Sequence, residues 1–530
     1  MNAPAPRNRE ALARMQFDRR TLLRYAGVGA GSIGTAALLA SCATNPSPTP
    51  SPDGGGGSAA SGGQLRLGIN GGTIGTQFDP HTAFDELHNF VAVAMYENVT
   101  QLNGRFELEN LLAEEVVPNA DGTEWTLRLR DGLEFHHGKT VTAEDVIFSY
   151  NRILDPAVGA IAAGLLAPID EMKALDDRTV RFTMAKPHGW FDLALGDGSV
   201  QGIIPTDFDI ENPVSTGPWA FVSHDPGKTA VWKRFENYHG QVAKADELVL
   251  QVLIDNDARV NALVSGQVDA ITGVPGNQVE RIRNGEGTDI ISRESGQFQL
   301  FRVRTDSGPF ADVRVRQALR MSLDRERINQ VAYGNQGIVG SDVYGRFDPA
   351  YDASLVRERD IAGAKALIAE AGAEGLKAEL ATWPGFAEAA QIIVANAKEV
   401  GLDITFAEKD EATYFGGYLD WDFGVDSYGA LSQITMAAQT DAAGAMNNGT
   451  HFSNAKYDEL FEQASAAMTA EERLPFLQEM QKIQFDEGGN IIPIFRNTLM
   501  GVSDKTSGWV EEDKNGMSVW RGLNQVSVSA

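Results

Sequence analysis

Reactive side chains are spread thinly along this sequence, and their spacing matches no catalytic or metal-binding motif. The only adjacent histidines are His136 and His137, and neighbouring residues of a strand point to opposite faces, so this pair is poorly placed to hold one metal ion. The remaining histidines form no H-x-x-x-H or His/Cys cluster. The motifs G-x-S-x-G, G-x-x-x-x-G-K-[ST] and H-E-x-x-H are absent. We therefore expect no enzyme activity, no catalytic residue, no metal and no cofactor.

The N-terminal 63 residues have the pattern of an export signal followed by a linker. Arginines within residues 19–24 precede an uncharged run, 25–41, which is too short and too rich in glycine and alanine for a membrane span. The first part resembles a twin-arginine signal, and Leu39-Ala40-Ser41-Cys42 resembles a bacterial lipobox. The resemblance implies that Cys42 becomes the lipid-carrying N-terminus after removal of residues 1–41. Residues 42–63 are rich in Pro, Ser and Gly, and we interpret them as a flexible linker.

One glycine pattern in this segment has to be set aside. Residues 29–34, GAGSIG, match the dinucleotide-binding pattern G-x-G-x-x-G. No strand precedes them and no βαβ unit contains them, so we do not interpret them as a nucleotide site.

Length, charge and cysteine content exclude several classes of protein. A chain of 530 residues is too long for one simple core and predicts two or three lobes. The formal charge of −27 argues against nucleic acid as a partner and against a basic patch on anionic lipid. Cys42 is the only cysteine, so no intrachain disulfide can form.

The clearest local pattern runs from residue 125 to residue 156. Apolar and polar residues alternate from Trp125 to Arg130, which predicts a half-buried strand. Thr142 can cap a helix that ends before Asp155-Pro156. From about Ser295 onward, helix and strand patterns alternate, which predicts a parallel sheet covered by helices.

Several short motifs follow one another along the chain. They are Phe78-Asp79-Pro80-His81, Phe135 with Gly138, Thr142 to Val146, Ser149-Tyr150, Thr216-Gly217-Pro218, 263–270 (LVSGQVDA), 313–319 (VRVRQAL), Leu323-Asp324-Arg325 and 364–372 (AKALIAEAG). In this order and spacing they resemble the bacterial extracellular solute-binding proteins of family 5, which serve ABC importers of dipeptides, oligopeptides and nickel chelates.

The resemblance implies an α/β fold of the type II periplasmic-binding-protein kind, with two lobes around a hinge and an extra domain inserted in the first lobe. It places lobe one at 64–100, 206–295 and 490–530, the inserted domain at 101–205, and lobe two at 296–489. The alternating elements after Ser295 fit lobe two independently.

The implied function is that of a lipid-anchored binding protein on the outer face of the cytoplasmic membrane. It would capture a peptide or a related amine- or carboxylate-bearing solute between its lobes and deliver it to the permease and ATPase of an ABC importer. We expect a monomer, exported by the twin-arginine route. Two alternatives stay open: a protein that binds a metal chelate or another specialised solute, and a surface sensor or chaperone without a transport role.

Two departures from the family pattern mark candidate ligand residues. Peptide-binding members often carry an amine-binding aspartate in a Trp-x-x-Asp segment, and the matching segment here is 423–426, with Phe423 in the tryptophan position and Asp426 as the acid. Ser427-Tyr428 follows, and we include Tyr428 among the candidates. Relatives commonly read Leu-x-x-Asn-Thr before the VRQAL helix, where this chain has Arg304 in place of asparagine.

Arginine in that position could hold a carboxylate or phosphate through two hydrogen bonds. Strand alternation places Arg302 on the same face as Arg304, so both are candidates. The alternative for both is an ion pair between the lobes or a solvated strand edge. Trp383, Phe386 and Tyr414 follow strand ends and could form a wall of the pocket, although packing is the commoner role of such aromatics.

Overall fold

The structure, a computed structural model, describes residues 62–71, 78–82, 86–198 and 200–529. The predicted signal of residues 1–41, Cys42 and the linker up to residue 61 lie outside the described residues. In the part of the chain that is described, no helix combines the length and the apolar character that crossing a bilayer needs.

The first lobe is built on a seven-stranded sheet with the order β12-β20-β11-β1-β10-β9-β8. Strand β1 lies inside it and pairs in parallel with β10 and β11, and its Leu65, Leu67 and Ile69 side chains are fully buried. The bounds are β1 (Gln64–Ile69), β8 (Trp219–Asp225), β9 (Thr229–Arg234), β10 (Glu247–Val252), β11 (Ala270–Ile271), β12 (Thr288–Arg293) and β20 (Thr498–Ser503).

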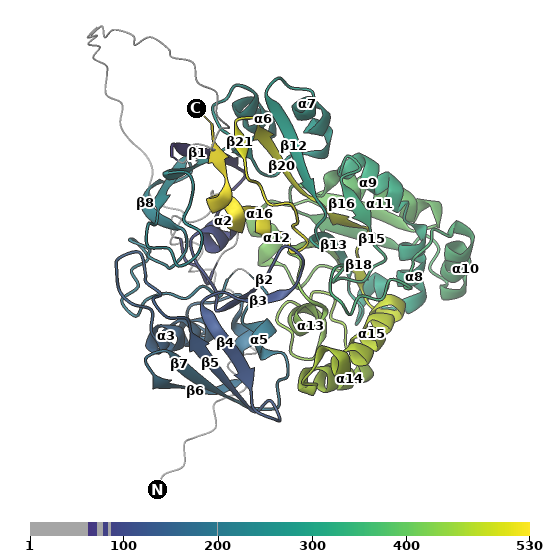
Figure 1. Cartoon of the computed structure of the whole chain (residues 1–530). Coiled ribbons are helices and arrows are strands. Elements are labelled where there is room, and N and C mark those ends of the chain that lie inside the picture. Colours follow the sequence, from purple (N-terminus) through teal and green to yellow (C-terminus); the bar gives the residue numbers. More distant parts are fainter. Residues whose placement is uncertain (1–61, 72–77, 83–85, 199, 530) are drawn as a thin grey trace. The chain divides into compact units, whose positions relative to one another are not determined.

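Short helices and two two-stranded sheets accompany this sheet (Figure 1). They are α2 (Glu86–Ala94), β2 (Thr100–Leu102), β3 (Leu108–Asn110), α6 (Asn256–Val264), η2 (Gly276–Gln278), α7 (Val279–Arg283), β21 (Thr506–Ser507), α16 (Ser518–Arg521), η5 (Gly522–Gln525) and β22 (Ser527–Val528).

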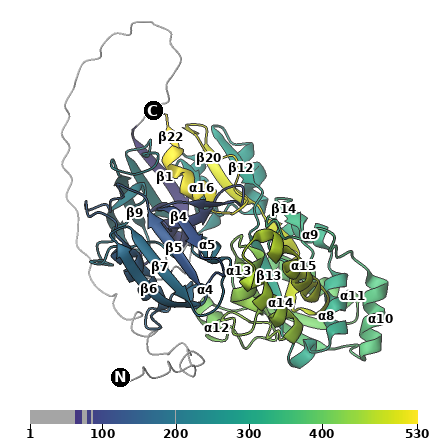
Figure 2. The ribbon, with the colours of Figure 1, turned by 60° about the horizontal axis from the view of Figure 1, so that its bottom comes forward.

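A four-stranded antiparallel sheet, β4-β5-β7-β6, forms between residues 113 and 184, inside the predicted inserted domain (Figure 2). Its elements are β4 (Ala113–Pro118), β5 (Glu124–Leu129), α3 (Ala143–Leu154), α4 (Ala163–Leu166), β6 (Ile169–Asp176), β7 (Thr179–Met184) and α5 (Phe191–Ala194). Helix α3 begins with a capping box formed by Thr142 and Asp145, in which the Asp145 carboxylate accepts a hydrogen bond from the Thr142 backbone N–H at 3.0 Å. The same carboxylate also accepts a hydrogen bond from the Thr142 hydroxyl at 2.9 Å. The strand and helix predicted within residues 125–156 are therefore confirmed.

The second lobe contains a mixed sheet with the order β14-β19-β13-β17-β15-β16, to which β18 adds by pairing with β13. Its strands are β13 (Phe298–Val303), β14 (Gly337–Val339), β15 (Lys377–Thr382), β16 (Asp403–Glu408), β17 (Phe423–Tyr428), β18 (Asn490–Ile491) and β19 (Ile494–Arg496). The predicted parallel sheet is right only for β15 with β16 and β17, because β13 pairs with its neighbours in antiparallel fashion.

Helices cover this sheet, and α8 to α11 gather around it in Figure 1. The bounds are η3 (Gly308–Phe310), α8 (Val313–Ser322), α9 (Arg325–Ala332), α10 (Ile361–Ala371), α11 (Ala387–Glu399), α12 (Glu411–Gly416), α13 (Gln433–Met436), η4 (Ala437–Asp441), α14 (Ala455–Ala466) and α15 (Ala470–Glu487). Helices α14 and α15 pack against each other as a hairpin (Figure 2).

The chain passes between the two large sheets at two places, from β12 to β13 and from β19 to β20. The resemblance to the family places the second passage at residue 490. In the structure β18 and β19 still belong to the second sheet, and the first sheet is reached only with β20 at Thr498. The boundary lies later than expected because β18 and β19 are two halves of one apolar stretch, separated by Ile492 and Pro493. Both halves pair with β13 of the second sheet.

Candidate functional site

Asp426 lies in β17 opposite Leu300 of β13, and its carboxylate is buried. One oxygen accepts a hydrogen bond from the Tyr418 hydroxyl, and the other accepts from the backbone N–H of Ser427 at 2.8 Å. Burial raises the pKa of Asp426 above its usual value, while the charge of Arg302 and the Tyr418 hydroxyl act in the opposite direction. A buried carboxylate of this kind can bind a cationic group strongly, because little water competes for it.

Two tyrosines stand beside this carboxylate. The hydroxyls of Tyr418 and Tyr428 lie 3.4 Å apart, and the Tyr428 ring stacks on Phe298 with ring centroids 5.7 Å apart. Tyr428 was a candidate from the sequence, but Tyr418 was not. Nothing in its local pattern separates Tyr418 from the other aromatics of 414–421, and only the path of the chain between α12 and β17 brings its hydroxyl to Asp426.

Arg302 of β13 lies opposite Gly424 of β17, next to the same site, and is 1% exposed. It donates hydrogen bonds to the carbonyl oxygens of Gly449 at 2.8 Å and Tyr418 at 2.5 Å, and its guanidinium lies 4.4 Å from the centre of the Tyr418 ring. Burial lowers its pKa, but the surrounding Tyr418, Tyr414 and Asp426 raise it by more, so the charge is retained. Arg302 therefore holds Tyr418 in place and balances the charge of Asp426.

The other candidates have different surroundings. Arg304 forms a two-bond ion pair with Asp306, at 3.0 and 2.9 Å, which lowers the pKa of Asp306 to about 2. Phe423 is fully buried and packs on Phe310, which is a core position. Trp383 is half-buried and packs on Phe386 and Tyr414, with ring centroids 4.8 Å away in each case. The structure thus brings Asp426, Tyr428 and Arg302 together, and Arg304 does not share a partner with them.

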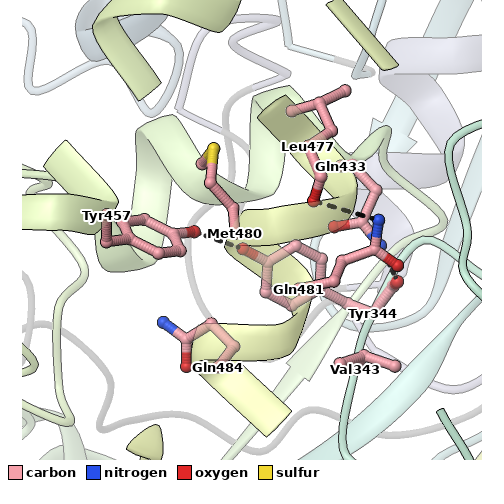
Figure 3. Close-up of a pocket in the computed structure, with 8 residues that line it drawn as sticks. All are labelled: Val343, Tyr344, Gln433, Tyr457, Leu477, Met480, Gln481 and Gln484. Atoms are coloured by element: carbon pink, nitrogen blue, oxygen red, sulfur yellow. Dashed lines mark hydrogen bonds between the residues drawn. The ribbon is translucent and has the colours of Figure 1, made fainter. Parts of the chain in front are cut away.

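The structure contains a small pocket in the second lobe (Figure 3). It measures about 10 Å³, which is room for one water molecule. Its lining residues are Val343, Tyr344, Gln433, Tyr457, Leu477, Met480, Gln481 and Gln484. Tyr344 donates a hydrogen bond to Asp441 at 2.6 Å, and burial raises the pKa of Asp441 to about 6.

A larger, open hollow of about 530 Å³ lies in the first lobe. Glu97 lines it and is buried, but its carboxylate already accepts hydrogen bonds from Tyr238 at 2.8 Å and Thr216 at 2.7 Å and lies 3.0 Å from the Nε2 atom of His239. None of the residues that line these two hollows is a ligand candidate from the sequence.

Residues of the inserted domain contact the second lobe directly. The Asp197 carboxylate accepts a hydrogen bond from the Ser432 N–H, at the start of α13, at 2.9 Å. Burial raises the pKa of Asp197 to about 6. Farther along, Arg473 of α15 donates to the Gly189 carbonyl at 2.7 Å, and the Gly189 N–H donates to the Ser465 carbonyl at 2.7 Å.

The described residues include no group of three or more His, Cys, Asp or Glu side chains arranged to hold a metal ion. Two α/β lobes joined by two crossing segments, with a buried carboxylate and tyrosines in the second lobe, define the class of the fold as a two-lobed α/β protein.

Comparison with known proteins agrees with that class. Residues 107–445 match the sequence profile of the bacterial extracellular solute-binding proteins, family 5 (middle region), and the chain belongs to this family. The expected family is thereby confirmed, and it is a family of binding proteins, not of enzymes.

Two relatives are glutathione-binding proteins named GsiB. The protein from Shigella flexneri is 24% identical over 477 residues, which cover 83% of this chain and 90% of the relative. The protein from Pectobacterium atrosepticum is 26% identical over 269 residues, so that match spans about half of each chain, 49% and 52%.

Solved structures confirm the expected fold. The ABC transporter-associated periplasmic binding protein DppA from Helicobacter pylori, in complex with the peptide STSA, has a TM-score of 0.79 and 21% identity over 89% of this chain and 99% of that one. NikZ from Campylobacter jejuni, in complex with Ni(L-His), has a TM-score of 0.77 and 19% identity. The match covers 88% of this chain and 99% of NikZ.

Proposed function

We propose that this protein is the lipid-anchored substrate-binding component of an ABC importer. In this proposal it captures a peptide or a related small amine-bearing solute between its lobes and delivers it to the permease of the importer, which an ATPase drives. We propose lobe one at 64–100, 206–295 and 497–530, the inserted domain at 101–205 and lobe two at 296–496, and the pairing of β18 and β19 with β13 supports the last boundary.

The observation that carries the proposal is the buried Asp426 carboxylate with Tyr418 and Tyr428 beside it. An ammonium group of a solute would find there a negative charge and hydroxyl groups with little competing water. The peptide complex of the Helicobacter pylori neighbour supports an amine-bearing solute in this fold.

Closure of the lobes around the solute is part of the proposal. The contacts of Asp197 with Ser432 and of Arg473 with Gly189 join the inserted domain to lobe two, and they support a closed state. A solute that contacts both lobes would shift the population toward that state.

The binding role can be tested with defined probes, namely dialanine, glutathione and a nickel–histidine complex, by thermal shift and calorimetry. We expect an amine-bearing probe to bind, and Asp426→Asn to weaken its binding by about 10- to 100-fold, the loss expected for a charge-assisted hydrogen bond. Asp420→Asn is the control, because Asp420 is an exposed carboxylate near the same strand. Unchanged affinity in Asp426→Asn would refute the amine role.

A metal chelate is the second candidate, favoured by the neighbour solved with Ni(L-His). In that case the protein would contact the organic part of the complex. A thermal shift of several degrees with nickel–histidine, together with none from dialanine or glutathione, would decide for the chelate and against the peptide.

The membrane anchor rests on the sequence Leu39-Ala40-Ser41-Cys42 and on the arginines of 19–24. Twin-arginine export would place the lipidated protein on the outer face of the cytoplasmic membrane. Intact-mass analysis of the protein from membrane fractions should find lipid on Cys42, and a soluble mature form without lipid contradicts the anchor.

A further inference from the structure

Strand β17, which carries Asp426, has two edges with different surroundings. On one edge it forms an antiparallel ladder with β13 along its whole length. On the other edge β15 pairs with it only at Phe423, opposite Leu380. Beyond Phe423 this second edge is where an extended peptide could add as a further strand, which is a common way for proteins to bind peptides.

Along β17, the backbone N–H and C=O groups of successive residues point alternately to the β13 edge and to the second edge. The Arg304 N–H donates to the Asp422 carbonyl at 2.9 Å, so Asp422 and, by alternation, Gly424 and Asp426 face β13. Val425 and Ser427 therefore face the second edge, and their N–H and C=O groups are the ones that an added strand would need.

The hydroxyl of Tyr414 occupies both groups of Val425. It donates to the Val425 carbonyl at 2.7 Å and accepts from the Val425 N–H at 2.7 Å. The N–H of Ser427 donates to the Asp426 carboxylate at 2.8 Å. Three of the main-chain groups along this edge thus already have partners from side chains of the protein itself.

Tyr414 is fixed in this position by its surroundings. It is fully buried, with Trp383 and Trp421 packed on its ring at centroid distances of 4.8 and 5.7 Å. The Trp421 indole N–H donates to the Tyr414 carbonyl at 3.0 Å. At Gly424 a Cβ atom would lie 2.7 Å from the Tyr414 hydroxyl, so glycine leaves the space that the hydroxyl needs.

We propose that Tyr414 closes the free edge of β17 to strand addition and thereby restricts the ligand to compact amine-bearing solutes of about dipeptide size. Such a solute is recognised through the side chains of Asp426, Tyr418 and Tyr428, and a longer peptide gains nothing from its additional main-chain groups. The inference rests on the proposed function, because it takes the Asp426 region as the ligand site.

The first test is the effect of peptide length on binding. Calorimetry with dialanine and tetraalanine should give dissociation constants for the wild-type protein that agree within about threefold, or weaker binding of tetraalanine. Tetraalanine that binds more than about tenfold tighter would contradict the inference, since about 1.4 kcal/mol of added binding requires contacts along the strand.

The second test follows hydrogen exchange at the Val425 amide and needs no ligand. In Tyr414→Phe the amide should exchange at least about tenfold faster than in the wild-type protein, while Tyr351→Phe, which removes a hydroxyl elsewhere in the same lobe, should leave it unchanged. Equal exchange in the wild-type protein and Tyr414→Phe would overturn the inference. If no amine-bearing probe binds the wild-type protein, the proposed function fails, and exchange at Val425 still decides whether Tyr414 holds the edge.

Discussion

His188 shows how one buried residue couples the stability of the protein to pH. Its ring packs on Trp190 with centroids 4.7 Å apart, and its Nε2 atom has no hydrogen-bond partner. Burial, with a smaller contribution from the charge of Arg473, lowers the pKa of His188 to about 4. The unfolded chain, with the ordinary value of 6.5, therefore takes up a proton more readily than the folded chain.

We predict that His188→Phe removes part of the loss of stability in acid. Because the folded pKa is the lower one, the contribution of His188 is complete above pH 6.5 and declines as the pH falls toward 4. At pH 5 the wild-type protein should have lost about 2 kcal/mol through this group. Urea unfolding at pH 8 and at pH 5 gives the difference in the free energy of unfolding between the variant and the wild-type protein. This difference should shift in favour of the variant by about 2 kcal/mol from pH 8 to pH 5.

The range from pH 7.5 to pH 8.5 is the internal control, because His188 is neutral there in both states. A difference between variant and wild type that stays constant from pH 8 to pH 5 would show that His188 does not titrate on unfolding.

At the scale of elements, the C-terminus of α15 is held by Arg316 of the VRVRQAL motif. Arg316 of α8 donates to the Glu487 carbonyl at 3.1 and 2.6 Å and to the carbonyls of Phe310 and Ala311 at 2.8 and 2.9 Å. The last carbonyl groups of a helix have no partner within the helix and carry partial negative charge. Arg316 therefore joins the end of α15, the turn η3 and helix α8.

Replacing Arg316 by methionine should destabilise the second lobe by about 2–4 kcal/mol, because buried carbonyl groups lose a charged donor. Arg327→Met on α9 is the matched control, since the Arg327 side chain is exposed and should change stability by less than about 0.5 kcal/mol. Calorimetric melting of both variants tests this, and equal midpoints would show that Arg316 contributes no more than a surface residue.

The sequence predicts an element well when the residues that determine its structure lie within the element itself. The strand and helix within residues 125–156 were predicted because alternation, cap and stop signals all lie inside the segment. Arg302 and Arg304 share a spacing, but β13 ends at Val303, so Arg302 enters the interior and Arg304 pairs with Asp306. No period in the sequence predicts that Tyr414 and Tyr418 reach β17, because their positions depend on how α12 packs on the sheet.

For the whole molecule, the proposed closure depends most on the contact between the inserted domain and the helix hairpin α14–α15. Apolar residues of both parts, including Trp190 and Leu460, belong to one continuous buried cluster. Backbone groups meet directly at Gly189, where any Cβ atom would collide with the carbonyl of Ala467. The close approach therefore requires glycine, and the two hydrogen bonds of Gly189 with Ser465 and Arg473 depend on that approach.

We predict that Gly189→Val keeps the fold of each lobe but shifts the molecule toward an open form. The added side chain separates the backbones at residues 189 and 467, so the cross-lobe hydrogen bonds cannot form while the sheets remain intact. Small-angle X-ray scattering should find a larger radius of gyration than for wild type, with an unchanged circular dichroism spectrum.

Gly164→Ala is the control, because its Cβ would have only one neighbour, the Met446 sulfur at 3.9 Å. Identical scattering of Gly189→Val and wild type would mean that this contact does not hold the lobes together, and a changed dichroism spectrum would mean that Gly189 is needed for folding and not for closure.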